Sequence, residues 1–358
     1  MNDTPQLPVI GAAEIALLEK LSNAVGVSGD EGEIRAIVLE EIKPLADELK
    51  IDALGNILAV RKAQQPGALK VMLAAHMDEI GFMLVDDHDG GLFQFALVGG
   101  IDERQLPGKT VLVGKNHAPG VIGAKPIHLQ EEGEDERAIP LDALRIDLGP
   151  GGDSKAKVGD RATFATRFRQ LGPSLLGKAL DNRLGVATLI YLFKNAPGNI
   201  ELQAAFTVQE EIGLRGARVA AYALNPHLAI AIDSTPAFDL PIHDGSENAV
   251  YNTRLDAGPA IYIADSGTLS DPRLIRLLAQ TGDELGIPYQ FRQPGGGGTD
   301  AGAIHKQRAG IPSVSVSVPG RYAHTAATLV RLDDWQNTLR LVFAALQRVT
   351  PGLLAEPR

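Results

Sequence analysis

Three apolar segments of this 358-residue chain run directly into histidine or carboxylate residues. These segments are residues 69–75 before His76, residues 204–209 before Glu210 and Glu211, and residues 227–232 before Asp233. Short apolar runs bounded by turn residues predict buried strands of a parallel sheet. Open α/β sheets bind their ligands at the carboxyl ends of such strands, so we expect these polar side chains to gather at one sheet edge.

The rest of the chain alternates between helical and extended patterns. Helical spacing of apolar residues predicts helices over residues 11–24, 28–45, 184–195, 214–224, 272–285 and 332–349, and extended patterns predict a hairpin over 49–60 and a strand over 313–318. Ser28 and Glu31 have the spacing of a capping box at the start of the second helix. This order predicts an α/β fold, a layered mixed sheet flanked by helices.

The stretch that follows the apolar segment 69–75 and His76 has a different sequence pattern. Short β-rich pieces separated by Gly, Pro and Asp cover residues 82–85, 92–98, 110–113, 120–122, 144–148 and 161–168. Several short strands at this spacing predict a small β-barrel or sandwich inserted into the α/β domain. The predicted division is a catalytic domain over residues 1–79 and 169–358, with an inserted β domain over 80–168.

Composition and charge exclude several classes of function. The chain has no cysteine, so any metal site must use histidine and carboxylate ligands. A net charge of -10 without a basic run argues against nucleic acid as a partner. The chain has no basic residue before Lys20 and no uncharged apolar run of about 18 residues, so we expect no signal peptide, no membrane helix and a cytoplasmic location.

Two further residues extend the predicted cluster. Asp181 opens a predicted helix, and His324 follows the strand that ends near residue 318. Mixed nitrogen and oxygen ligands suit zinc, cobalt or manganese, and several carboxylates are needed to balance the charge of two neighbouring ions. Such a pair of ions implies hydrolysis, and Asp78 is placed to orient His76.

More ordinary interpretations exist for each feature. An isolated glutamate pair is usually a solvated turn, but an apolar strand places Glu210 and Glu211 beside a surface of low dielectric, where carboxylates need a cation or hydrogen-bond donors. His128 and His305 are rival metal ligands, whereas the other histidines suit the surface or the core. Residues 295–298 are four consecutive glycines without the lysine of a phosphate-binding loop, so they predict a flexible turn near the site.

Six sequence blocks together resemble the TET aminopeptidases, a family of dinuclear metallopeptidases that includes glutamyl and deblocking aminopeptidases and some members named endoglucanase. The blocks are AAHMDEIGF (74–82), GKALDNRLG (177–185), VQEEIGLRGA (208–217), AIDST (231–235), GGGTDAGAIH (296–305) and RYAHT (321–325). They occur in order over nearly the whole chain.

The resemblance implies a role for each residue of the cluster. One ion is held by His76, Asp181 and Asp233, and the other by Asp181, Glu211 and His324, so that Asp181 bridges the two ions. Glu210 is the general base that activates a bridging hydroxide, and Asp78 orients the first histidine.

The resemblance also implies partners and cofactors. Members remove amino-terminal residues from peptides, usually with zinc or cobalt, and their inserted β domain mediates dimerisation and assembly into tetrahedral dodecamers. The chain departs from the family pattern at Ser234 and at Thr325-Ala326, which affects pocket shape but replaces no ligand. The sequence alone identifies no substrate-binding residue.

Three alternatives remain open at this point. A related dinuclear metallo-carboxypeptidase or deacylase uses a similar cluster. A glycosidase needs two separated carboxylates and no metal. A non-catalytic assembly protein requires none of these side chains for activity.

Overall fold

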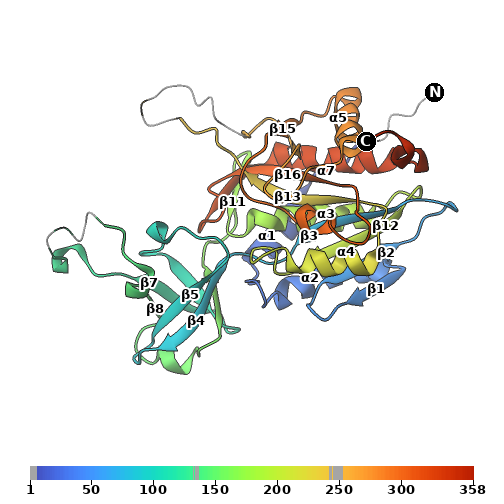
Figure 1. Ribbon diagram of the computed structural model, residues 1–358. Helices are drawn as coiled ribbons and strands as arrows, with labels where there is room; N and C mark the ends of the chain where they lie inside the picture. The colour runs from blue at the N-terminus through green and yellow to red at the C-terminus, as the bar shows by residue number, and fades with distance from the viewer. Residues whose placement is uncertain (1–5, 132, 134–136, 242–243, 245–252) are drawn as a thin grey trace.

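The computed structural model describes residues 6–131, 133, 137–241, 244 and 253–358. The fold is built around an eleven-stranded mixed sheet (Figure 1). The strand order is β1-β2-β12-β3-β13-β16-β17-β11-β10, and β14 pairs with both β16 and β15. The strand bounds are β1 Glu48–Ile51, β2 Ile57–Arg61, β3 Lys70–His76, β10 Arg169–Leu171, β11 Ser174–Gly177, β12 Glu201–Thr207, β13 Leu228–Pro236, β14 Ala260–Tyr262, β15 Gln290–Arg292, β16 Ser313–Arg321 and β17 Thr328–Arg331.

The central strands β12, β3, β13 and β16 are parallel, as the continuous apolar runs predict. The register pairs Thr207 of β12 with His76 of β3. It also pairs Ala231 of β13 with Ala74 of β3, so two residues further along Asp233 lies level with His76. Parallel pairing therefore brings the ends of these strands to one edge, where the predicted cluster forms.

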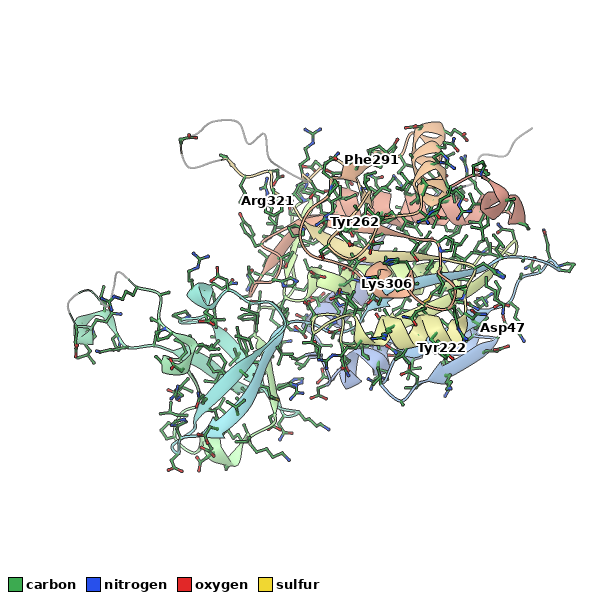
Figure 2. The ribbon with its side chains drawn as sticks, in the orientation of Figure 1. Asp47, Tyr222, Tyr262, Phe291, Lys306 and Arg321 are labelled. Atoms are coloured by element: carbon green, nitrogen blue, oxygen red, sulfur yellow. The ribbon has the colours of Figure 1, made fainter. Side chains whose placement is uncertain are left out.

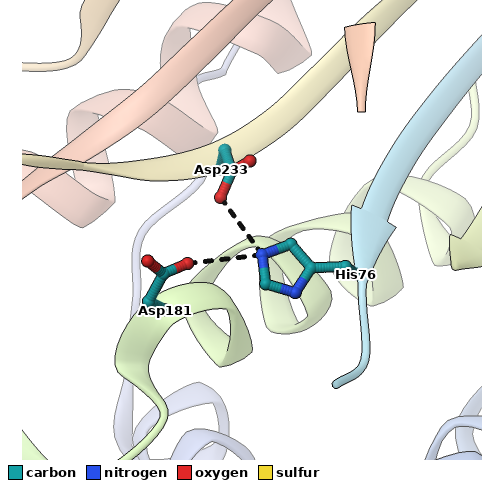
Figure 3. Close-up of side chains that lie close together, drawn as sticks. All are labelled: His76, Asp181 and Asp233. Carbon is teal, nitrogen blue, oxygen red and sulfur yellow. Dashed lines mark ion pairs between the residues drawn. The ribbon is translucent and has the colours of Figure 1, made fainter. Parts of the chain in front are cut away.

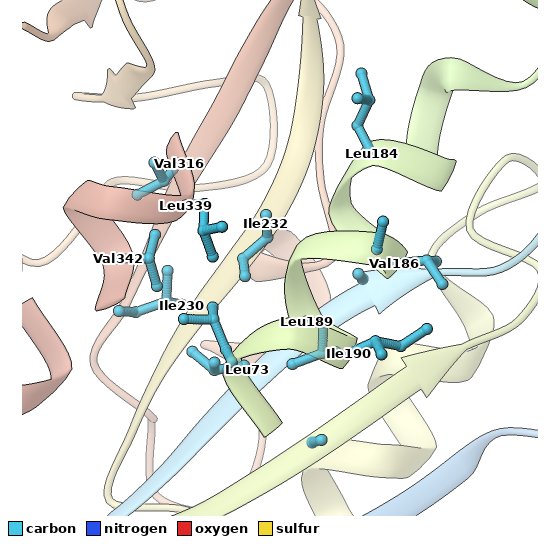
Figure 4. Packing of buried hydrophobic residues seen from close by; sticks show 14 of the residues in the cluster. Leu73, Leu184, Val186, Leu189, Ile190, Ile230, Ile232, Val316, Leu339 and Val342 are labelled. Carbon is cyan, nitrogen blue, oxygen red and sulfur yellow. The ribbon is translucent and has the colours of Figure 1, made fainter. Parts of the chain in front are cut away.

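Helices cover both faces of this sheet. Their bounds are α1 Ala12–Asn23, α2 Gly32–Ile42, α3 Leu180–Lys194, α4 Arg215–Leu224, α5 Pro272–Leu285, α6 Ala301–Ile304 and α7 Leu332–Gln347. Side chains of a strand alternate between faces. In β3, Leu73 packs towards α3 and α7 (Figure 4). Met72 and Ala74 pack on the other face with residues of α4 and α6. Burial of both faces explains why these strands carry no polar alternation.

The inserted segment forms a closed six-stranded antiparallel barrel beside the sheet (Figure 1). The barrel order is β4-β5-β8-β7-β6-β9, with bounds β4 Gly81–Asp87, β5 Leu92–Val98, β6 Thr110–Val113, β7 Ala118–Gly123, β8 Arg145–Asp147 and β9 Arg161–Phe164. Phe82 is buried in the core of the barrel, with the rings of Phe95 and Phe164 each 5.2 Å away in edge-to-face geometry. The predicted fold class is confirmed, and the barrel is the form that the insert takes.

Two local predictions are wrong. The strand expected to run up to Glu210 ends at Thr207, because the N–H of Val208 turns away to the side chain of Asn56. The capping box at Ser28 is also absent: α2 begins at Gly32 without a side-chain cap, and the Ser28 hydroxyl donates to the carboxylate of Asp78 instead. Ser28 therefore belongs to the cluster at the sheet edge.

None of the helices in the described residues is both long and apolar enough to span a membrane.

Candidate metal centre

His76 is the last residue of β3 and is buried, with its ring pointing into the sheet edge. Its Nε2 atom lies 3.3 Å from Oδ1 of Asp181 and 3.5 Å from Oδ1 of Asp233 (Figure 3). Asp181 comes from the first turn of α3, and Asp233 from within β13. Three elements that are distant in sequence thus place one nitrogen and two oxygen atoms around a common point.

A second group of three lies beside the first. Nε2 of His324, in the loop between β16 and β17, lies 3.6 Å from Oδ2 of Asp181 and 3.4 Å from Oε2 of Glu211. In each group the candidate ligand atoms all lie within 4.8 Å of one another. Asp181 belongs to both groups and presents a different oxygen to each histidine.

The spacing within both groups suits a metal ion. Tetrahedral ligands at about 2.0–2.1 Å from zinc lie about 3.3 Å from one another. The four nitrogen–oxygen distances range from 3.3 to 3.6 Å. The donor set of two imidazoles and three carboxylates, without sulfur, suits zinc, cobalt or manganese.

Backbone carbonyl groups orient both histidines. Nδ1 of His76 lies 3.2 Å from the carbonyl oxygen of Asp78, and Nδ1 of His324 lies 2.8 Å from the carbonyl oxygen of Gly100. A proton on each Nδ1 leaves each Nε2 free as a ligand. Gly100 follows β5, so the inserted barrel segment fixes one of the two imidazoles.

Asp78 connects the glutamate pair to His76. Its buried carboxylate accepts the N–H groups of Glu210 and Glu211 at 3.0 and 3.2 Å, and the hydroxyl of Ser28 at 2.6 Å. Its Oδ1 lies 3.6 Å from Nδ1 of His76, further away than its own carbonyl oxygen. Asp78 therefore holds the turn that carries both glutamates, and it contacts His76 mainly through its backbone.

Burial makes the ionised carboxylates of the cluster unfavourable. It raises the pKa of Glu210 well above its usual range and that of Glu211 to about 8. The pKa of Asp233 is raised as well, again by burial. Burial also opposes the ionisation of Asp181, but its contacts with His76 and His324 lower the pKa of Asp181 to about 2. A buried site with this excess of negative charge is suited to divalent cations.

The rival histidines lie elsewhere. His128 is part of a short 3-10 helix, Ile127–Leu129, in the barrel segment, and Nδ1 of His305 contacts the carbonyl oxygen of Ala301. Neither belongs to the two groups. All five ligand residues predicted from the sequence are brought together, as are Glu210 and Asp78 beside them.

Asp300 is a buried acid near the site that the sequence analysis did not identify. Its Oδ2 accepts the hydroxyl of Thr207 at 2.5 Å, and its Oδ1 has no hydrogen-bond partner among the described residues. Burial raises the pKa of Asp300 to about 7. A Gly-rich loop precedes Asp300, and nothing in that local pattern distinguishes it from a helix cap.

A pocket of about 380 Å³ opens beside the two groups. Beyond the cluster it is lined by Ser234, Pro236, Phe238, Tyr262, Arg292, the glycines 296–298 and Ala323. The predicted position of the glycine-rich turn near the site agrees with this lining. The other lining residues come from segments far apart in the sequence, so no local motif marks them.

The sequence matches a known peptidase family. A sequence model described as M42 glutamyl aminopeptidase matches residues 55–341. A putative aminopeptidase of Acetivibrio thermocellus is 38% identical over 92% of this chain and 97% of its own length. A lysyl aminopeptidase of Pyrococcus furiosus (32% identical, 94% of this chain and 97% of its own) and a glutamyl aminopeptidase of Lactococcus lactis (30% identical, 92% and 95%) also match.

Solved structures share the whole fold. An aminopeptidase of the archaeon Desulfurococcus kamchatkensis superposes with a TM-score of 0.89 at 33% identity, covering 96% of each chain. The TET1 peptidase of Pyrococcus horikoshii, described as able to assemble into a tetrahedron or a large octahedral shell, has a TM-score of 0.82 at 32% identity and covers 94% of this chain and all of its own.

Proposed function

Because the chain belongs to the M42 glutamyl aminopeptidase family of hydrolases, we propose that it removes single residues from the free amino termini of peptides with two divalent ions, zinc or cobalt. The main support for two ions is the position of Asp181, because its two oxygens face two different imidazoles. A single structural metal needs only one group of ligands.

Each ion has its own set of ligands in this proposal. His76, Asp181 and Asp233 would hold one ion, and Asp181, Glu211 and His324 would hold the other. When bound, the two ions supply a nucleophile at neutral pH and stabilise the charge that develops on the scissile carbonyl. The remaining chemistry belongs to the side chains around them.

Glu210 is the proposed general base. It lines the pocket beside His76 and Asp233 without being a member of either ligand group. Its carboxylate takes a proton from the attacking water and then delivers that proton to the nitrogen of the departing peptide. The N–H of Glu210 is anchored on Asp78, which fixes the backbone that carries the base.

Family membership leaves the preferred substrate side chain open. Relatives of similar identity carry the names lysyl and glutamyl aminopeptidase, and these names denote side chains of opposite charge. The choice for this chain depends on the residues that line its own pocket.

A panel of aminoacyl-anilides tests the reaction class. We expect the chelated protein to be inactive and turnover to return when zinc, cobalt or manganese is added back. Acetylation of the substrate's amine should abolish cleavage by an aminopeptidase. A deacylase or carboxypeptidase instead accepts substrates that lack a free amine, and a glycosidase releases reducing sugar from a β-glucan after chelation.

Self-association is a second part of the proposal. Structures of similar fold include peptidases described as dodecamers or closed shells. The barrel presents exposed apolar side chains, among them Ile127 at 77% and Leu129 at 60% relative exposure. We propose that residues 80–168 mediate dimerisation and that dimers assemble into a tetrahedral dodecamer, so native mass spectrometry should detect twelve chains rather than one or two.

A further inference from the structure

The pocket beside the metal centre has a buried wall and an exposed wall. Tyr262 and Arg292 line the buried wall, where the guanidinium carbon of Arg292 lies 4.4 Å from the centre of the Tyr262 ring. Phe238 also lines the pocket, but 54% of it is exposed. An aminopeptidase encloses the first residue of its substrate, and the rest of the peptide extends into solvent. The second residue of a bound peptide therefore passes the exposed wall.

Two neighbouring chain segments form this exposed wall. The strands β13 and β16 are parallel, and Pro236, the last residue of β13, is level with Gly320 of β16. Beyond the strand, the N–H of Ala237 donates to the carbonyl oxygen of Gly320 at 2.8 Å. Phe238 is the second residue after β13, and Tyr322 is the first residue after β16. The two aromatic residues therefore lie where these neighbouring strands end.

An ion pair joins the two segments. Nε and Nη2 of Arg321, which Figure 2 labels, donate to the two carboxylate oxygens of Asp239 at 2.7 and 2.9 Å. Such a double contact between guanidinium and carboxylate fixes both the distance and the relative orientation of the two groups. Asp239 directly follows Phe238, and Arg321 directly precedes Tyr322. The ion pair therefore holds the backbone that carries both aromatic side chains.

Phe238 and Tyr322 form an aromatic rim next to the metal centre. Tyr322 is 52% exposed, and the two residues that follow it, Ala323 and His324, both line the pocket. Exposed aromatic side chains bury a large apolar area when a ligand covers them. Because the aromatic rim is continuous with the pocket in which we place the scissile bond, the ligand that covers it is the departing part of the peptide.

We propose that the aromatic rim binds the second residue of the substrate, and that the protein prefers peptides in which this second side chain is large and apolar. This inference rests on the proposed aminopeptidase activity and adds a substrate class defined by the second residue. That side chain packs against the rings of Phe238 and Tyr322, while the peptide bond before it lies at the cluster around Asp181. A second residue without an apolar side chain leaves both rings in contact with water.

The test compares kcat/KM for amidated tripeptides with the metal-loaded protein. The first residue is the one that the anilide panel favours, the second is Phe, Leu, Gly or Asp, and the third is Gly. Release of the first residue is measured by chromatography. Anilides are unsuitable here, because their own ring takes the place of the second residue. We expect Phe to exceed Gly at the second position by about 10-fold or more, with Leu between them and Asp no better than Gly.

Variants of the aromatic rim should lower this Phe:Gly ratio. Phe238→Ser and Tyr322→Asn should each reduce it by about 3- to 10-fold, mainly through KM, because the metal ligands are unchanged. Asparagine suits the positive φ of 63° at Tyr322, and Tyr322→Phe, which keeps the ring, should retain the ratio. Tyr222→Ser is the matched control: Tyr222 is an exposed tyrosine of α4 in a different part of the catalytic domain from Arg321 (Figure 2), so the ratio should stay unchanged.

The outcomes separate the two proposals. A wild-type Phe:Gly ratio near or below one contradicts the role of the aromatic rim while the aminopeptidase reaction stands. An equal fall for all four peptides in Phe238→Ser shows that the ring only supports the pocket wall, and a changed oligomeric state with an unchanged ratio assigns the rim to a subunit contact; both contradict the inference. Absence of turnover on every peptide and anilide contradicts the aminopeptidase reaction and the inference with it. If the variants do not fold, the wild-type ratio decides.

Discussion

The carboxylate of Asp78 accepts the backbone N–H of Glu210 at 3.0 Å. The same carboxylate accepts the N–H of Glu211, and the backbone carbonyl of Asp78 contacts the ring of His76. One buried residue therefore fixes the proposed base, a proposed ligand of one ion and, through its backbone, a proposed ligand of the other.

Replacement of Asp78 should impair both metal binding and turnover. Asp78→Ala leaves two half-buried backbone N–H groups and the buried hydroxyl of Ser28 without their acceptor. Loss of such supporting contacts typically lowers activity or metal affinity by about 10- to 100-fold. Steady-state kinetics and competition with a chelator measure the two effects. Asp86→Ala, which removes an exposed carboxylate of the barrel, is the control, and equal behaviour of the two variants contradicts the role of Asp78.

Glu210→Gln should retain the metals and lose turnover. The amide keeps the size of the side chain, and Glu210 belongs to neither ligand group, but the amide cannot accept the proton of water. General-base catalysis typically contributes about 10²- to 10⁴-fold, so kcat should fall by that amount while metal content stays at the wild-type value. Activity within a few-fold of wild type means that another group is the base. Glu201→Gln, at the opposite end of β12, is the matched control.

Glu79 should be important for stability. It is buried, and it accepts Nζ of Lys178 at 2.9 Å, Nη2 of Arg183 at 3.2 Å and the hydroxyl of Thr163 at 2.8 Å. Thr163 belongs to the barrel, whereas Lys178 follows β11 of the large sheet and Arg183 lies in α3, so Glu79 joins the two parts. Glu79→Ala leaves two buried cations unpaired, which typically lowers the free energy of unfolding by about 3–5 kcal/mol.

Denaturant unfolding measures this effect. Glu48→Ala is the control, because Glu48 pairs with Lys62 on the surface, where both side chains are more than 60% exposed. Water and salt screen such a pair, and its loss should change stability far less. A similar change in both variants shows that the buried cations find other partners.

Asp334 should make stability depend on pH. Its buried carboxylate, in the first turn of α7, accepts the N–H groups of Asp256 and Gly258 at 2.8 Å each. Burial nevertheless raises the pKa of Asp334 to about 6. In the unfolded chain this carboxyl loses its proton near pH 3.9. Between about pH 4 and pH 6, Asp334 is therefore protonated to a greater extent in the folded state than in the unfolded state. The contribution of Asp334 to stability is therefore present below this window and lost as pH rises through it, by roughly 1–3 kcal/mol.

The comparison with Asp334→Asn isolates this contribution. The amide does not titrate, so the free energy of unfolding of the variant should fall less than that of the wild type between about pH 4.5 and about pH 7. The prediction is contradicted if the free energies of unfolding of the two proteins fall by the same amount over this pH range, even if one protein is more stable than the other at every pH.

The sequence predicts those parts of the fold that have a strong local pattern. The runs before His76 and Asp233 are buried on both faces, so they lack polar alternation and read as central parallel strands. Parallel pairing then implies that the polar residues after them meet, without knowledge of the strand order. The position of Asp181 at a helix start and of His324 in the loop after a strand predicts that both lie near this edge, but their assignment to particular ions comes only from the resemblance to the TET aminopeptidases.

The strands and site residues that the sequence does not predict depend on tertiary contacts. The strands β10 and β17 are three and four residues long, too short to show a period. Ser28 has the spacing of a helix cap, but the buried carboxylate of Asp78 is the stronger acceptor for its hydroxyl. Arg292 looks like a surface residue in sequence, and only the pairing of β15 with β14 brings it to the pocket wall.

Anomalous diffraction from crystals of the zinc- or cobalt-loaded protein is the most direct test of the two-ion centre. We expect two ions per chain, one bound by His76, Asp181 and Asp233 and the other by Asp181, Glu211 and His324, with Asp181 shared between them. Active crystals with a single ion, or with ions bound by other residues, would contradict the two-ion centre and the reaction proposed for it.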